Sequence, residues 1–124
     1  MLIEGLIAIF IFSMGILAIV GLQSVSVKQV GDAAYRSQAA VLTNTLLGTM
    51  WVSDHTNATM KASFNSPNGA GYTAWLTNVS ATLPQSSATV NVGLNNTVTV
   101  TVKWLPPAET GGTSHQYVTV AQIK

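Results

Sequence analysis

The residue types that acid–base or nucleophilic chemistry uses are few in this sequence, and their spacing does not suit it. Ser53, Asp54 and His55 are adjacent, whereas a serine–histidine–aspartate relay needs groups that the fold assembles from separate positions. The second histidine, His115, is remote in sequence, and the chain has no cysteine and only four acidic residues, so no metal-site spacing occurs. No glycine-rich phosphate loop is present either. The sequence predicts no catalytic, cofactor or metal site, and we expect no enzyme.

Glu4 is the charged residue whose position suggests a role. It stands before an otherwise charge-free segment that ends only at Lys28. A charge at the centre of a membrane helix costs about 2.5–3.5 kcal/mol. At the interface, a carboxylate instead favours a helix N-terminus by a few tenths to about 1 kcal/mol. Position alone leaves two interpretations open: an interfacial Glu4, or a Glu4 that pairs with a cation inside a protein assembly.

The segment after Glu4 is long enough to cross a bilayer as a helix. Between Gly5 and Leu22, Ser13 is the only polar side chain. About 20 apolar residues at 1.5 Å per residue span the hydrocarbon core, where a helix satisfies its own backbone groups. The run is longer than that of a cleaved signal peptide and no Lys or Arg precedes it, which disfavours that interpretation. A simple single-span anchor stays an alternative on hydropathy alone.

Composition excludes other classes of partner. Charged residues make up 7% of the chain and the formal net charge is +1. No basic field is available to hold nucleic acid and no acidic field to hold cations, so we predict no nucleic-acid site.

Three stretches of the N-terminal segment carry a family resemblance: residues 2–9 (LIEGLIAI), 12–17 (FSMGIL) and 21–23 (GLQ). They resemble the N-terminus of type IV pilins, and most closely that of PilV-type minor pilins. Residues 35–40 (YRSQAA) are similar to the same group, so the resemblance covers roughly the first 40 residues.

The resemblance implies a filament subunit made with a short basic leader, which a prepilin peptidase removes before it methylates the new N-terminus. The subunit then lies in the inner membrane until it joins an extracellular or periplasmic filament used in adhesion or motility. In the family the glutamate is the fifth mature residue and is thought to pair with the N-terminal amine of a neighbouring subunit. Here the corresponding residue, Glu4, is fourth.

Helical periodicity continues beyond the apolar run. Tyr35, Ala39, Leu42, Leu46 and Met50 are spaced by four, three, four and four residues, which predicts an apolar stripe on one long helix that ends near residue 50. We therefore divide the chain into an apolar helix (1–22), the amphipathic half of the same helix (23–52) and a globular head (53–124).

The head carries a strand signal. Residues 97–104 alternate strictly and place Val98, Val100, Val102 and Trp104 on one face. Residues 88–94 alternate as well, with Val90, Val92 and Leu94 inward, and Asn95-Asn96 suits a two-residue hairpin. Residues 117–123 predict a third strand, residues 73–79 a fourth strand or a helical turn, and residues 53–72 a connecting region.

The prediction is an α+β pilin fold: a long N-terminal helix packed against a C-terminal antiparallel sheet of three to four strands. Helix–sheet packing is assigned to the helical stripe and the inward residues of 97–104. Assembly with other pilin subunits is assigned to Glu4 and to the apolar residues Met1, Leu2, Ile3, Leu6, Ile9, Phe10, Phe12, Ile16, Leu17 and Val20. The alternatives are a pseudopilin of a type II secretion system and a membrane-anchored periplasmic binding module.

Asn57, Asn78 and Asn95 also lie in Asn-x-Ser/Thr sequons.

Overall fold

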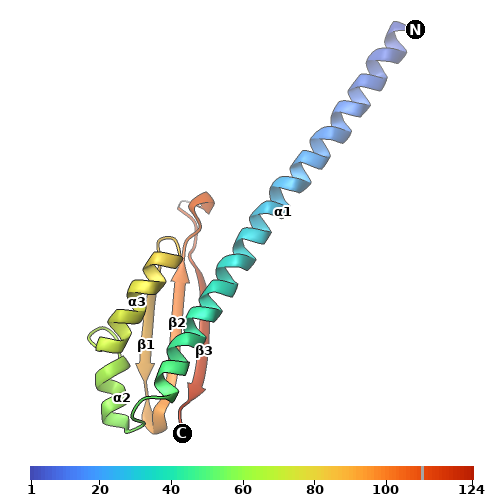
Figure 1. Ribbon diagram of the computed structural model, residues 1–124. Helices are drawn as coiled ribbons and strands as arrows, with labels where there is room; N and C mark the ends of the chain where they lie inside the picture. The colour runs from blue at the N-terminus through green and yellow to red at the C-terminus, as the bar shows by residue number, and fades with distance from the viewer. Residues whose placement is uncertain (110) are drawn as a thin grey trace. The chain divides into compact units, whose positions relative to one another are not determined.

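A computed structural model of the protein describes residues 1–109 and 111–124, and divides into two compact units, Met1–Ala34 and Tyr35–Lys124. One helix, α1 (Leu2–Trp51), runs through both units (Figure 1). The second unit adds two helices and a sheet, which confirms the α+β class. Their bounds are α2 (Asn57–Phe64), α3 (Ala70–Thr82), β1 (Ser87–Val92), β2 (Thr97–Trp104) and β3 (His115–Gln122), with 3₁₀ turns η1 (Leu94–Asn96) and η2 (Pro107–Glu109).

Helix α1 ends close to the predicted position, and local hydrogen bonds explain why it ends there. The last carbonyls of a helix have no partner within it. The Ser53 N–H and hydroxyl both donate to the Met50 carbonyl, at 3.2 and 2.8 Å, and His55 Nε2 lies 2.9 Å from the Trp51 carbonyl oxygen. These bonds satisfy the C-terminal carbonyls and turn the chain toward α2.

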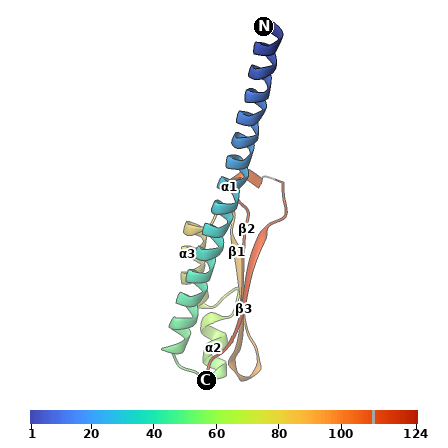
Figure 2. The same ribbon diagram turned by 90° about the vertical axis from the view of Figure 1, so that its right-hand side faces the viewer.

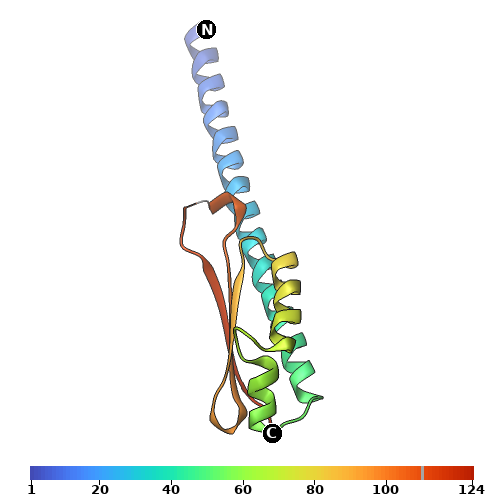
Figure 3. The ribbon, with the colours of Figure 1, turned by 90° about the vertical axis from the view of Figure 1, so that its left-hand side faces the viewer.

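The three strands form an antiparallel meander in the order β1-β2-β3, as predicted. Even-numbered residues of β1 and β2 face the core. Val90, for example, pairs with Val100 across the two strands, and both side chains are fully buried. Helices α2 and α3 and the second half of α1, residues 35–51, cover one face of this sheet, and the other face is open (Figures 2 and 3). A sheet with one covered face requires this alternation of apolar and polar residues.

The turn between β1 and β2 is longer than predicted. It comprises residues 93–96, closed by a 2.8 Å bond from the Gly93 N–H to the Thr97 carbonyl. Asn95 and Asn96 do adopt positive φ (55° and 54°), as the prediction required. Leu94 was predicted to face inward and this is wrong, because β1 ends at Val92 and Leu94 is 80% exposed in the turn.

The region before the sheet is helical, which corrects one prediction and decides between the alternatives of another. Residues 53–72 are not merely a connecting region, because they contain α2 and the start of α3. Residues 73–79 lie within α3, which confirms the helical alternative and removes the fourth strand from the described part of the chain. Gly69 makes this arrangement possible: a Cβ there would lie 2.5 Å from the Ser63 carbonyl oxygen, where α2 and α3 meet.

Two hydrogen bonds fix α3 in the core. Trp75 Nε1 donates to the Leu42 carbonyl of α1 at 2.8 Å, and the Tyr72 hydroxyl donates to the Ala88 carbonyl of β1 at 2.7 Å. Both aromatic rings are buried and their polar atoms are satisfied, as buried Trp and Tyr require. The core of the head therefore joins all three helices to the sheet.

Candidate functional site

The first half of α1, residues 2–30, is exposed around its whole circumference. Every residue from Met1 to Val30 is exposed, and an 18-residue window of the helix has a mean hydropathy of 2.6 with none of it buried. The predicted assembly residues keep exposed fractions between 47% (Ile16) and 106% (Met1). They are Met1, Leu2, Ile3, Leu6, Ile9, Phe10, Phe12, Ile16, Leu17 and Val20. By length and composition, this helix could cross a membrane.

Water alone is a poor environment for such a surface. Full burial of a Leu, Ile or Phe side chain is worth about 1.5–3 kcal/mol. Soluble monomers seldom expose an apolar patch of more than a few hundred Å². By this physical argument, lipid or other protein is a more favourable environment than water for the first half of α1.

The exposed apolar surface is wider than the predicted assembly set. Eight other residues of the first half of α1 belong to it: Ile7, Ile11, Met14, Ile19, Leu22, Val25, Val27 and Val30. Those up to Leu22 lie within the apolar helix that the prediction placed at residues 1–22, where the absence of any polar face already signalled all-round exposure to an apolar medium. Val25, Val27 and Val30 lie beyond the predicted apolar run.

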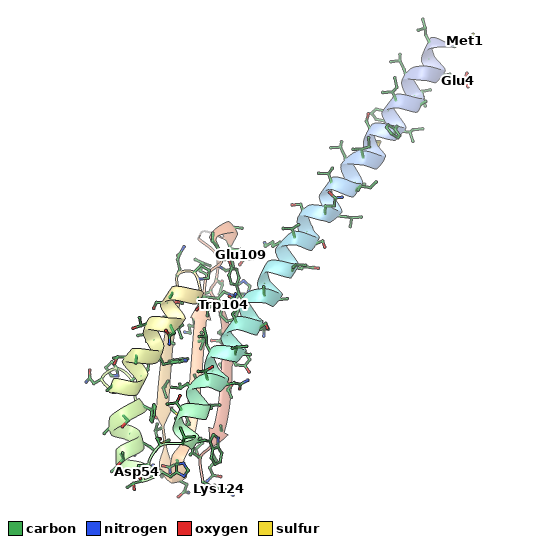
Figure 4. The ribbon with its side chains drawn as sticks, in the orientation of Figure 1. Met1, Glu4, Asp54, Trp104, Glu109 and Lys124 are labelled. Carbon is green, nitrogen blue, oxygen red and sulfur yellow. The ribbon has the colours of Figure 1, made fainter. Side chains whose placement is uncertain are left out.

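Glu4 lies in the first turn of α1 and is exposed (Figure 4). The nearby Gly5 N–H donates to the Met1 carbonyl at 3.2 Å, so the helix is formed up to this end. The carboxylate is the single charged side chain among residues 1–27. Glu4 is therefore an isolated charged side chain on an otherwise uncharged, mainly apolar helix surface.

The predicted packing residues lie where the sequence placed them. Seven are buried: Ala39, Leu46, Met50, Val98, Val100, Val102 and Trp104. Tyr35 and Leu42 are partly buried and pack against the same cluster. The stripe on the second half of α1 is thus core packing within the head.

The prediction missed the share of the core that α2 and α3 provide. Met60 and Phe64 of α2 are buried with Tyr72, Trp75 and Val79 of α3. Their spacings of four, three and four residues carry a helical signal, which is short because the turn at residues 65–69 interrupts it. Thr43 of α1 is also fully buried, and its type gave no indication of this.

Ser53, Asp54 and His55 each have a local hydrogen-bond partner. The Ser53 hydroxyl donates to the Met50 carbonyl, and His55 Nε2 contacts the Trp51 carbonyl. Asp54 Oδ1 accepts from the N–H and the hydroxyl of Thr56, at 2.9 and 2.7 Å. These bonds lower the pKa of Asp54, the backbone N–H most strongly. Each group serves the loop before α2.

The Glu109 carboxylate is a partner of the His115 ring. His115 Nε2 lies 2.7 Å from Glu109 Oε2, and the histidine ring stacks on Trp104 with centroids 6.0 Å apart. Trp104 and Glu109 lie at the end of the head opposite Asp54 and Lys124 (Figure 4). Over residues 1–109 and 111–124, no three His, Asp or Glu side chains come together as a metal site would need.

Comparison of the chain with models of known protein families, with curated protein sequences and with solved structures gives no match.

Proposed function

We propose that this protein is a structural subunit of a type IV pilus or a closely related filament, held in the inner membrane before assembly. The observation that carries the proposal is the first half of α1, apolar and exposed on every side, with Glu4 as its only charged side chain before Lys28. Lipid covers this surface first, and the corresponding helices of other subunits cover it in the filament. The same apolar area that retains the subunit in the membrane then stabilises the filament core.

Glu4 distinguishes an assembling helix from a simple anchor. A helix packed among its own kind excludes water from this carboxylate, and a buried charge without a partner is strongly unfavourable. The N-terminal amine of a neighbouring subunit supplies the positive charge. An anchor that stays in lipid gives Glu4 no such requirement, because the side chain reaches the interface.

The head supports a structural role. An open depression of ≈ 310 Å³ on the outer face of the sheet has Lys103 as the one charged residue of its lining, with Ser, Thr, Ala, Gln and Val side chains around it. Convergent titratable groups typical of an active site do not line this depression. In the filament the head faces outward and presents its loops.

Mass spectrometry of sheared surface filaments tests the proposal. Presence of the chain in filaments, with a processed and methylated N-terminus, supports it and implicates a prepilin peptidase. Recovery only with a type II secretion apparatus identifies a pseudopilin instead. Absence from both fractions, with the chain retained in the membrane, overturns the assembly proposal in favour of an anchored module.

The Glu4→Ala variant tests the charge pairing. We expect membrane insertion to be intact and incorporation into filaments to fall sharply, since removal of one partner of a buried pair costs about 3–5 kcal/mol. Asp54→Ala, which removes an exposed carboxylate of the head, is the matched control and should incorporate normally. Normal incorporation of Glu4→Ala would show that this carboxylate has no pairing role.

A further inference from the structure

The two edges of the sheet differ in how their backbone groups are satisfied. At the β1 edge, the Ser66 N–H and hydroxyl donate to the Val90 carbonyl at 2.9 and 3.0 Å. The Val92 N–H donates to Asn65 Oδ1 at 3.1 Å, and the Tyr72 hydroxyl donates to the Ala88 carbonyl. The turn between α2 and α3, together with Tyr72 of α3, therefore covers this edge.

The bonds at the β1 edge also reveal which groups are open on β3. Ala88, Val90 and Val92 direct their backbone N–H and C=O groups away from β2. The odd-numbered residues of β1 therefore form the backbone hydrogen bonds to the odd-numbered residues of β2. The even-numbered residues of β2 then form their backbone hydrogen bonds to β3. The register pairs those even residues with the odd residues of β3, as in Val100 with Thr119. The Ile123 N–H donates to the Asn96 carbonyl at 3.1 Å, which agrees with this pattern.

The even residues of β3 therefore direct their N–H and C=O groups outward. These residues are Gln116, Val118, Val120 and Gln122, and their backbone groups accept or donate no hydrogen bond within the described part of the chain. Unpaired strand edges are templates for another strand, and proteins usually protect them with Lys, Pro, a bulge or a covering segment. Strand β3 has neither Lys nor Pro and carries no acidic residue.

We propose that the β3 edge pairs with the β3 edge of a second copy of this chain, in antiparallel orientation. With Thr119 opposite Thr119 of the second copy, Val118 lies opposite Val120, and Gln116 lies opposite Gln122. Every outward N–H and C=O of the four open residues then has a partner. The strand is self-complementary in this register, and it has no acidic or Lys/Arg side chain that would repel its own copy.

Side chains on the outer face of the sheet favour the same pairing. Val118 and Val120 are 49% and 63% exposed although both are apolar. In the pair each of these valines lies directly across from the other, and such β-branched cross-strand pairs contribute about 0.2–1 kcal/mol each. The two sheets become one six-stranded sheet.

The covered β1 edge limits the product to a dimer. A two-fold pair uses the same edge of both copies, and the remaining edges of the joined sheet are the two β1 edges. Because Asn65, Ser66 and Tyr72 occupy those edges, no third copy can extend the sheet. The inference uses the head alone and stands whether or not α1 assembles into a filament.

Single cysteines test the register, because the natural chain contains none. Residues facing each other in a non-hydrogen-bonded antiparallel pair have Cα atoms about 4.5 Å apart, within the range for a disulfide. In the full chain in detergent under mild oxidation, we expect Thr119→Cys to form a disulfide dimer rapidly. Ala121→Cys is the matched control on the same strand and face, where the two copies lie about 14 Å apart.

Slow or equal cross-linking of the two cysteine variants would overturn the proposal, because association through α1 brings both pairs together equally.

A second measurement uses charge. Val120→Lys should weaken dimerisation by about tenfold or more, since an edge lysine disfavours strand addition. Thr89→Lys adds the same charge to the outer face of β1 and should leave the dimer unchanged. An unchanged dimer in Val120→Lys would also contradict the pairing.

Discussion

The two halves of α1 share one backbone conformation and differ in what covers their apolar side chains. In the second half, Ala39, Leu46 and Met50 form a stripe that the head's own helices and strands bury. In the first half, the structure buries no side chain from Met1 to Val30. A stripe can be satisfied within one chain, whereas a helix that is apolar on every side needs a medium or several neighbours. The helix thus joins an element of a folded domain to an element that depends on its surroundings.

Truncation of one leucine in each half should separate the two roles. Leu46→Ala removes a side chain that is 2% exposed, and we expect the free energy of unfolding of the head to fall by about 2–5 kcal/mol. Leu17→Ala, at 71% exposure, should leave it unchanged. Urea denaturation followed by tryptophan fluorescence measures both. Equal losses would show that the first half is part of the head's core.

A charge in the middle of the first half should affect the membrane and not the head. Met14→Lys places an ammonium group near the centre of the apolar run, at a cost to insertion of about 2.5–3.5 kcal/mol. We expect a large loss of carbonate-resistant membrane protein. Asn44→Lys, on the exposed side of the second half, is the control and should insert normally. Full retention of Met14→Lys in the membrane would contradict a lipid-embedded first half.

The contact between α3 and the second half of α1 includes one specific polar bond. Trp75→Phe keeps most of the ring but removes the Nε1 donor to the Leu42 carbonyl, so we expect a loss of roughly 0.5–1.5 kcal/mol in unfolding free energy plus some loss of packing. Trp51→Phe changes a half-exposed tryptophan at the C-terminal end of α1 and should lower the free energy of unfolding by less. A larger effect at Trp51 would argue against this assignment.

The smallest effect concerns Asp54, in the loop that follows α1. Folding lowers its pKa below the ordinary value of 3.8, because the Thr56 N–H and then its hydroxyl bind the carboxylate. Because the pKa of Asp54 is lower in the folded state than in the unfolded state, the carboxylate stabilises the fold at any pH above its unfolded-state pKa. This stabilisation is lost as the pH falls through the folded-state pKa. The stability difference between the native chain and Asp54→Ala should therefore shrink between about pH 7 and about pH 3. A difference that grows on acidification would have the wrong sign.

Periodicity predicted the elements whose patterns are long. The stripe from Tyr35 to Met50 and the alternation of Val98, Val100 and Val102 extend over enough residues to fix both type and face, and the structure confirms them. Helices α2 and α3 carry only short apolar sets, and the Ser66-Pro67-Asn68-Gly69 turn between them dominated the local pattern. That region was therefore interpreted as a connection.

The candidate sites likewise include one that the sequence predicts and one that it does not. The apolar character of the first half of α1 is a property of composition and could be predicted directly. The open β3 edge could not, because it depends on which strand lies at the edge and on the Asn65 and Ser66 bonds that cover the opposite side. Likewise, the exposure of Leu94 follows from the turn length, which the Asn95-Asn96 pair alone does not specify.

The contacts of Asn57 have a consequence for attached sugars. Its Nδ2 donates to the Gly93 carbonyl at 2.9 Å and to Asn96 Oδ1 at 2.8 Å, so both amide hydrogens are in use between α2 and the β1–β2 turn. An N-linked glycan would replace one of them and break that link. Asn78 and Asn95 are exposed, so in a host that glycosylates Asn-x-Ser/Thr the folded head offers its carbohydrate positions on α3 and at the tip of the hairpin.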